Sequence, residues 1–134
     1  MSSTYSRTGL DIESARHSTS DMLIAADKVE GTAVYNPAGE HLGTIDTFML
    51  DKVSGNAAYA VLSFGGFLGL GTRHYPLPWS TLKYDRNYGG YVINLEKSLL
   101  EQAPSYDDSD DVTWEDRAWG QRLHDYYHAR PYWM

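Results

Sequence analysis

Two histidines near the end of the chain have the spacing of a metal-binding pair. His124 and His128 are four residues apart, so a helix would place both on one face, with Asp125 beside them. A zinc site needs three or four ligands, and the spacing indicates no third. The segment also lacks the glutamate that acts as general base in His-Glu-x-x-His. We therefore predict no metal site and interpret both histidines as solvated or packing residues.

The glycine-rich segment at residues 65–71 invites comparison with a phosphate-binding loop. It contains no lysine and does not match Gly-x-x-x-x-Gly-Lys-Ser/Thr. It carries Phe67, Leu68 and Leu70 where the backbone would have to approach a phosphate. We interpret it as a bent loop between strands. If its three apolar side chains are exposed, they form a patch of the kind that marks an interface.

Carboxylates and serines are the remaining candidates for catalysis. Asp46 and Asp51 flank an apolar strand segment, and four aspartates occur within residues 107–111. Acid–base chemistry requires surroundings that separate the pKa values of two carboxyl groups, whereas turn capping or solvation accounts for these. Ser63 and Ser80 lie outside any Gly-x-Ser-x-Gly context. We predict no catalytic residues and no cofactor site, and we expect that the chain is not an enzyme.

The bulk composition favours a single small domain. The chain has 134 residues, of which 42% are hydrophobic, enough for one modest core. No stretch approaches the roughly 20 apolar residues of a membrane helix, and the N-terminus lacks the apolar segment of a signal peptide. The absence of cysteine fits a reducing compartment. We expect a cytoplasmic protein without direct membrane insertion.

The net charge of −7 is concentrated at the C-terminal end. Residues 105–134 carry three basic and seven acidic groups, whereas residues 25–104 carry six and eight. Nucleic-acid affinity comes largely from lysine and arginine contacts to phosphates, and the chain has no basic stripe. We therefore expect no nucleic-acid partner.

Alternating apolar residues and closely spaced turns predict a mainly β domain over residues 22–106, after a flexible arm at 1–21. The expected strands are 31–35, 42–50, 57–64, 75–79, 82–84 and 91–95. One break in alternation between Ile45 and Phe48 predicts a β-bulge. Pro76 and Pro78 lack amide hydrogens and place their strand at an edge. Six short strands of this kind are typical of a small barrel.

Particular positions follow from this pattern. The strand at 57–64 is apolar on both faces, as expected for a central strand that is buried on both sides. Leu77 and Trp79 are expected in the core, and Tyr88, in a turn, is expected to be exposed. A short helix of one or two turns is expected at 98–102, before Pro104.

Residues 107–134 are predicted to form an acidic linker and an aromatic amphipathic helix. Thr113 is the expected N-cap, with carboxylates in the first turn. Trp119, Leu123 and Tyr126 fall at i, i+4 and i+7, and Trp114 widens the same face. Such a helix must bury this face, either on its own barrel or on a second chain.

An ordered set of segments between residues 25 and 106 carries a family resemblance. Val-Tyr-Asn-Pro-Ala-Gly-Glu at 34–40 leads into Leu-Gly-Thr-Ile at 42–45, and Phe-Gly-Gly-Phe-Leu-Gly-Leu-Gly at 64–71 precedes Tyr-Pro-Leu-Pro-Trp at 75–79. Tyr-Val-Ile-Asn-Leu follows at 91–95. This order resembles the PRC-barrel family, named for the cytoplasmic barrel of the photosynthetic reaction-centre H subunit. The resemblance implies a small six-stranded PRC-type β-barrel that serves as an assembly or docking module, here in a free-standing version.

Two functional hypotheses follow. The first is a non-catalytic interaction module that binds a protein partner or itself as a homo-oligomer. Its contacts would come from the apolar loop, the C-terminal helix or both: Phe67, Leu68, Leu70, Trp114, Trp119, Leu123 and Tyr126. The alternative is a small-ligand or metal-binding barrel, with the barrel mouth or the His124/His128 pair as its site.

Overall fold

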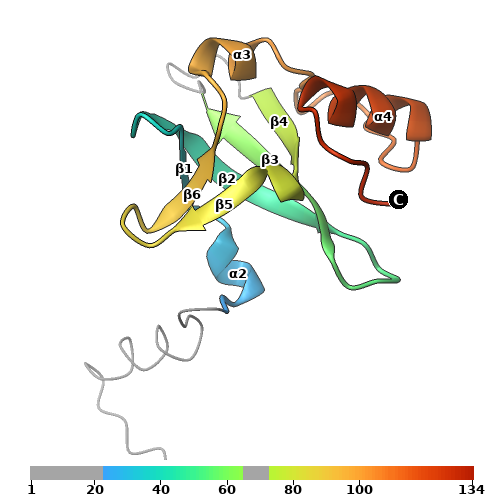
Figure 1. The fold of residues 1–134 in the computed structure, drawn as a ribbon. Helices are drawn as coiled ribbons and strands as arrows, with labels where there is room; N and C mark the ends of the chain where they lie inside the picture. Colours follow the sequence, from blue (N-terminus) through green and yellow to red (C-terminus); the bar gives the residue numbers. More distant parts are fainter. Residues whose placement is uncertain (1–22, 65–72) are drawn as a thin grey trace, which may run out of the picture.

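A computed structural model describes residues 23–64 and 73–134, which form a curled six-stranded sheet with short helices around it (Figure 1). The strand order is β4-β3-β2-β1-β6-β5. The strands are β1 (Ala33–Tyr35), β2 (His41–Leu50), β3 (Ala57–Phe64), β4 (Arg73–Pro78), β5 (Leu82–Asp85) and β6 (Gly90–Ile93). The helices are α2 (Ala26–Val29), α3 (Lys97–Glu101), α4 (Arg117–Tyr126) and the 3-10 helix η2 (Trp79–Thr81). The predicted mainly β fold is confirmed, including the short helix after the last strand and the C-terminal helix.

The curl of the sheet depends on irregular pairing along β2. The register between β2 and β3 shifts between Ile45 and Thr47, where the sequence predicts a bulge. An extra residue on one strand bends it and increases its twist, which lets the long β2 follow the curl. β4 lies at an edge of the sheet, as predicted from Pro76 and Pro78.

The inner face of the sheet holds the main core. Ala60 pairs with Leu77 and Leu62 pairs with Tyr75 across β3 and β4, and all four are buried. They pack with apolar residues of the other strands, namely Val34, Leu42, Ile45, Leu82 and Ile93. Leu77 is fully buried as predicted, Trp79 is half-buried against the core, and Tyr88 is exposed.

The opposite face of β3 and β4 is buried as well. Side chains alternate along a strand, so Tyr59, Val61, Pro76 and Pro78 point away from the inner core. We call these four residues the outer face. All four are fully buried, and the sequence prediction of a strand buried on both sides is confirmed for β3.

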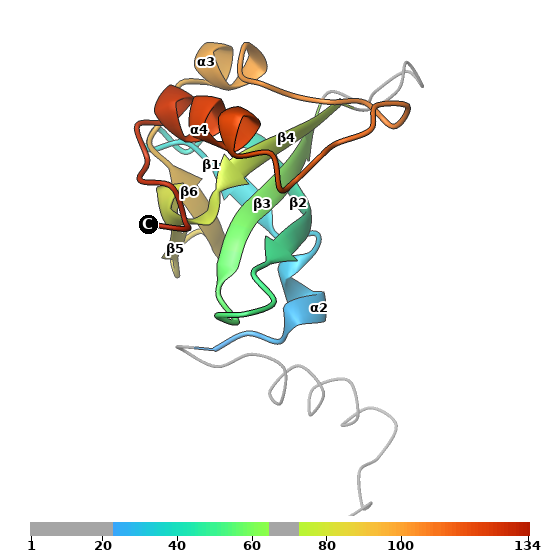
Figure 2. The same ribbon diagram turned by 90° about the vertical axis from the view of Figure 1, so that its right-hand side faces the viewer.

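The C-terminal segment of the same chain covers Tyr59 on the outer face and packs against β4. We call residues 107–134 the tail; it consists of a linker at 107–116, helix α4 and a final turn. Figures 1 and 2 show α4 lying beside β4, and the inner side of the helix is buried through Leu123. The sequence left open whether this helix packs on its own barrel or on a second chain. In this structure it packs on its own.

Helix α4 begins three residues later than expected. Asp116 is the N-cap, and its Oδ1 accepts hydrogen bonds from the amides of Ala118 (2.9 Å) and Trp119 (3.2 Å). The prediction of Thr113 as N-cap is wrong, because its carbonyl accepts from the Asp116 amide in a separate preceding turn. A carboxylate at this position also interacts favourably with the positive end of the helix dipole.

A glycine in the middle of α4 permits the chain end to fold back. A Cβ added at Gly120 would lie 2.9 Å from the Trp133 ring and 3.2 Å from the Tyr59 hydroxyl oxygen. The Arg117 guanidinium lies 4.5 Å from the centre of the Trp133 ring, a cation–π contact. The final turn is therefore part of the same packed unit as α4.

Gly90 provides a test of the pairing between β1 and β6. A Cβ at this position would lie 2.5 Å from the Ala33 carbonyl oxygen, so Gly90→Ala must push the two strands apart. We expect the free energy of unfolding to fall by roughly 1–3 kcal/mol in urea titrations followed by circular dichroism. Gly89→Asn is the matched control, because a Cβ there meets open space and asparagine tolerates its φ of 64°. An equal loss in both variants would contradict the assignment.

Leu123 provides a test of the packing of the tail. Its side chain is fully buried, so Leu123→Ala should lower the free energy of unfolding by about 2–5 kcal/mol in the same titration. The control is Gln121→Ala on the exposed side of α4, for which we expect a change within about 0.5 kcal/mol. Unchanged stability in Leu123→Ala would mean that the tail does not pack on the barrel in solution.

Candidate functional site

An aromatic cluster around Tyr59 joins the outer face to the tail. The Tyr59 ring is surrounded by four rings of the tail, with centroid distances of 5.6 Å to Trp114, 5.9 Å to Trp119, 5.4 Å to His124 and 5.5 Å to Tyr132. Several of these pairs meet edge to face or tilted, the geometries that aromatic rings prefer. Tyr59 is thus the central contact between barrel and tail.

The edge of β4 is closed where the chain enters the tail. His74 and Tyr106 exchange two backbone hydrogen bonds, of 2.7 and 2.9 Å. The His74 ring lies between two carboxylates, with Nε2 2.6 Å from Asp108 and Nδ1 3.2 Å from Asp46. These contacts attach the start of the tail to both β4 and β2.

The acidic linker combines turn formation with contacts to the barrel. Asp107 accepts hydrogen bonds from the amide and hydroxyl of Ser109, and these bonds lower the pKa of its carboxyl group, with a smaller contribution from Arg73. The Arg73 guanidinium lies 3.6 Å from the Asp107 carboxylate. Turn capping was predicted for these aspartates, whereas the contacts to Arg73 and His74 were not. The pKa of Asp51 is likewise lowered by hydrogen bonds from Val53 and Ser54 in its own turn.

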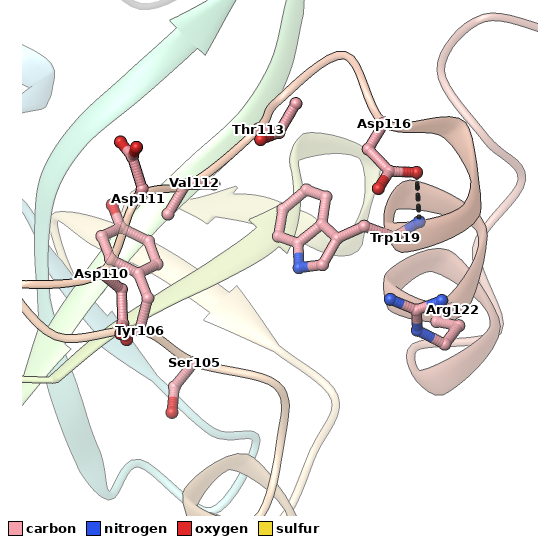
Figure 3. A pocket seen from close by; sticks show the side chains of 9 residues that line it. All are labelled: Ser105, Tyr106, Asp110, Asp111, Val112, Thr113, Asp116, Trp119 and Arg122. Atoms are coloured by element: carbon pink, nitrogen blue, oxygen red, sulfur yellow. Dashed lines mark hydrogen bonds between the residues drawn. The ribbon is translucent and has the colours of Figure 1, made fainter.

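A cavity of about 250 Å³ lies between the linker and α4 (Figure 3). The Trp119 indole occupies the space between α4 and the linker, and Asp116 makes its capping bond to the backbone of Trp119. The cavity is lined by Ser105, Tyr106, Asp110, Asp111, Val112, Thr113, Asp116, Trp119 and Arg122. Two of its carboxylates already serve local structure, because Asp116 caps α4 and Asp110 accepts from the Asp107 amide. The cavity is therefore a seam between packed elements.

Buried polar atoms without a hydrogen bond gather where the tail meets the barrel. Within the described ranges they include the Tyr59 and Tyr127 hydroxyls and Nε2 of His124, whereas Nδ1 of His74, although it makes no hydrogen bond, lies 3.2 Å from the Asp46 carboxylate. His124 places Nδ1 2.7 Å from the Gly120 carbonyl oxygen. A carbonyl can only accept, so Nδ1 donates this hydrogen bond, and Nε2 is buried without a hydrogen-bond partner.

Burial changes the acidity of the two tyrosines at this contact. Desolvation raises the pKa of Tyr59 to about 12, with a further increase from Tyr132 and an opposing effect of Arg117. Burial also raises the pKa of Tyr127 far above its ordinary value, with smaller contributions from Tyr126 and Tyr75. Both hydroxyls are neutral at physiological pH, as their apolar surroundings require.

The interaction residues predicted from the sequence do not form one cluster in the described part of the structure. Trp114 and Trp119 meet at Tyr59, and Leu123 lies in the core beneath α4. Tyr126 instead donates its hydroxyl hydrogen to the Leu99 carbonyl, toward α3. The loop residues Phe67, Leu68 and Leu70 lie outside the described residues.

The histidine pair does not converge. His124 is fully buried, whereas His128 is exposed and has a φ of 55° just after the end of α4. In the part of the chain that the structure describes, no three side chains of His, Cys, Asp or Glu gather closely enough to hold a metal ion. Sequence reasoning missed Tyr59 and the final Tyr132 and Trp133. The signal for Tyr59 was its place in a strand that is apolar on both faces.

Tyr59→Phe provides a test of the unpartnered hydroxyl. We expect stability at pH 7 to stay unchanged or rise by up to about 1 kcal/mol, because no hydrogen bond is lost. In the parent protein, the Tyr59 hydroxyl has a pKa of about 12 when the chain is folded and about 10 when it is unfolded. Because the unfolded chain loses this proton first, the free energy of unfolding falls as the pH rises from about 10 to 12. Tyr59→Phe should lose less stability over this range, whereas Tyr88→Phe, at an exposed position, should not differ from the parent. Urea titrations at pH 7, 10 and 12 measure both effects, and destabilisation by Tyr59→Phe at pH 7 would contradict the assignment.

Comparison with known proteins identifies the fold. Among residues 23–64 and 73–134, no helix has the length and apolar character needed to cross a membrane. A search of curated proteins gave no match. The family model described as PRC-barrel domain matches residues 22–100, more than half of the chain, and confirms the resemblance seen in the sequence. The chain therefore belongs to the PRC-barrel family.

Proposed function

We propose that this chain is a non-catalytic protein-interaction module and that the outer face is its binding surface. The observation that supports this most directly is that the outer face holds an aromatic helix, the chain's own α4. A PRC-barrel domain suggests a small β module of the kind often used in interaction and assembly. The outer face is the location that we propose for this role on this chain.

The shape and chemistry of the outer face suit a helix better than an added strand. The edge of β4 is paired with Tyr106, and Pro76 and Pro78 offer no amide hydrogens for further pairing. Tyr59 and Val61 provide an apolar surface on β3, which is flanked by β4 and β2 in the sheet. A ligand for such a surface is an amphipathic helix that inserts apolar and aromatic side chains at i, i+3 and i+4 spacing.

Self-association is the form of binding that we favour. Every copy of the chain carries a segment of the required chemistry, with Trp119 and Leu123 one turn apart on α4. The outer face of one copy therefore has a suitable ligand in the tail of any other copy. Cytoplasmic location and a homo-oligomeric state remain part of this proposal.

A peptide experiment tests the outer face as a binding surface. The full chain with Trp119→Ala and Leu123→Arg has a disabled tail, and it is titrated into a fluorescently labelled peptide of residues 112–134. We expect saturable binding by fluorescence anisotropy, because the peptide can take the place of the disabled tail. Adding Val61→Arg, which places a charge on the outer face, should abolish binding.

Circular dichroism serves as the folding control for both variants. If the disabled-tail chain keeps its β-sheet spectrum and still fails to bind the peptide, the outer face is not a helix-binding surface and the proposal is wrong. Binding that survives Val61→Arg would place the contact elsewhere on the domain and would contradict it equally.

A further inference from the structure

We infer that two copies of this chain exchange tails, each placing its α4 on the outer face of the other. The inference deepens the proposed function, because it relies on the outer face being a protein-binding surface and adds the mode of binding, a reciprocal exchange of tails through the linker. Three features of the structure lead to it: the slack in the linker, the exposed contacts that hold the linker, and the buried polar atoms beneath the tail.

The linker is longer than the closed chain needs. Tyr106 immediately precedes it and Trp114 lies near its C-terminal end, yet their rings meet edge to face with centroids 6.1 Å apart. The seven residues between them form no helix or strand. Figure 2 shows this part of the chain running out beyond the end of β4 and back to α4. Straightened, seven residues span up to about 23 Å, enough to carry α4 from its own barrel to a neighbouring one.

The contacts that fold the linker back are exposed and polar. The side chains of Arg73 and Asp107 are 48% and 46% exposed, and that of Asp108, which contacts His74, is 83% exposed. Ion pairs in such positions are screened by water and salt and hold their partners weakly. These contacts therefore add little to the closed form, and the main cost of straightening the linker is the loss of the apolar packing around Tyr59 and Leu123.

The contact beneath the tail is less favourable than its apolar content suggests. Three fully or nearly buried groups, Tyr59, His124 and Tyr127, each have a polar atom with no hydrogen bond there. Native proteins contain few such atoms, and each regains a partner in water when the tail lifts. Opening is thereby made easier and exchange between copies more accessible.

An opened chain cannot stay open at high concentration. Opening exposes Tyr59 and Val61 on the barrel and Leu123 on the tail, and apolar side chains that are buried in the closed form favour renewed contact. A second copy offers the same surface with the same fit. A pair with exchanged tails regains the contacts between α4 and the outer face of two closed monomers, so the balance depends on protein concentration and on the linker.

Mixing two complementary full-length variants tests the exchange. One carries Val61→Arg, which disables the outer face and leaves the tail intact, and the other carries Leu123→Arg, which disables the tail and leaves the outer face intact. Only exchange allows the mixture to form one intact contact, between the tail of the first and the outer face of the second. We expect a one-to-one heterodimer by size exclusion with light scattering, absent from either variant alone.

Two linker variants serve as matched controls in the same mixing experiment. Replacing residues 107–112 by Gly-Gly in both partners removes the slack and should abolish the heterodimer. Replacing the same six residues by Gly-Ser-Asn-Gly-Ser-Asn keeps the length without the aspartates and should preserve it. A heterodimer that persists with the short linker would contradict exchange and indicate another contact.

The outcomes separate this inference from the function on which it rests. If the peptide of residues 112–134 binds the disabled-tail chain and the complementary variants still do not pair, tail exchange is wrong and the binding surface stands. If neither the peptide nor the partner chain binds, both are wrong. Should the arginine variants fail to fold, Val61→Ala and Leu123→Ala replace them; exchange then predicts a heterodimer about as abundant as the parent dimer, and its absence at concentrations where the parent dimerises would overturn exchange.

Discussion

The structure depends on the burial of β3 on both of its faces. Inside the curl, Ala60 and Leu62 contribute to the core, and on the other side Tyr59 and Val61 require a second apolar layer. A curled sheet alone would leave that side in water, where each buried apolar side chain would lose roughly 1.5–3 kcal/mol of hydrophobic stabilisation. The tail supplies the missing layer. The packing of α4, the return of the chain end and the closing of the β4 edge all follow from this requirement.

The tail is acidic in composition and yet covers an apolar surface of the sheet. All of its aspartates except Asp125 lie in the linker, where they form turns, contact Arg73 and His74, and cap α4. Four of its rings face Tyr59. This division lets a strongly charged segment cover an apolar sheet, but the cover leaves buried hydroxyl and imidazole atoms without hydrogen bonds. An aromatic contact that leaves buried polar atoms without hydrogen bonds is suited to opening and forming again. This property connects the packing of the domain to the binding role that we propose.

Much of the fold could be predicted from local pattern. Alternation of apolar residues placed the six strands within a few residues, the break near Asp46 located the bulge, and two prolines placed β4 at an edge. These features depend on backbone geometry and on residues that are neighbours in the chain. The N-cap was misplaced because Thr113 and Asp116 are both good capping residues, and only the three-dimensional course of the turn selects between them.

The sequence by itself determined that a helix with Trp119 and Leu123 on one face had to bury that face, and that β3 had two faces to bury. Only the tertiary structure decided that these two requirements satisfy each other within one chain. It also decided that Tyr59 is the central contact and that His124 is buried beside it, apart from His128. The physical reason is that hydrophobic burial has no direction of its own. The amino-acid sequence determines how much apolar surface must be buried. The path of the linker determines which surface of the protein buries it.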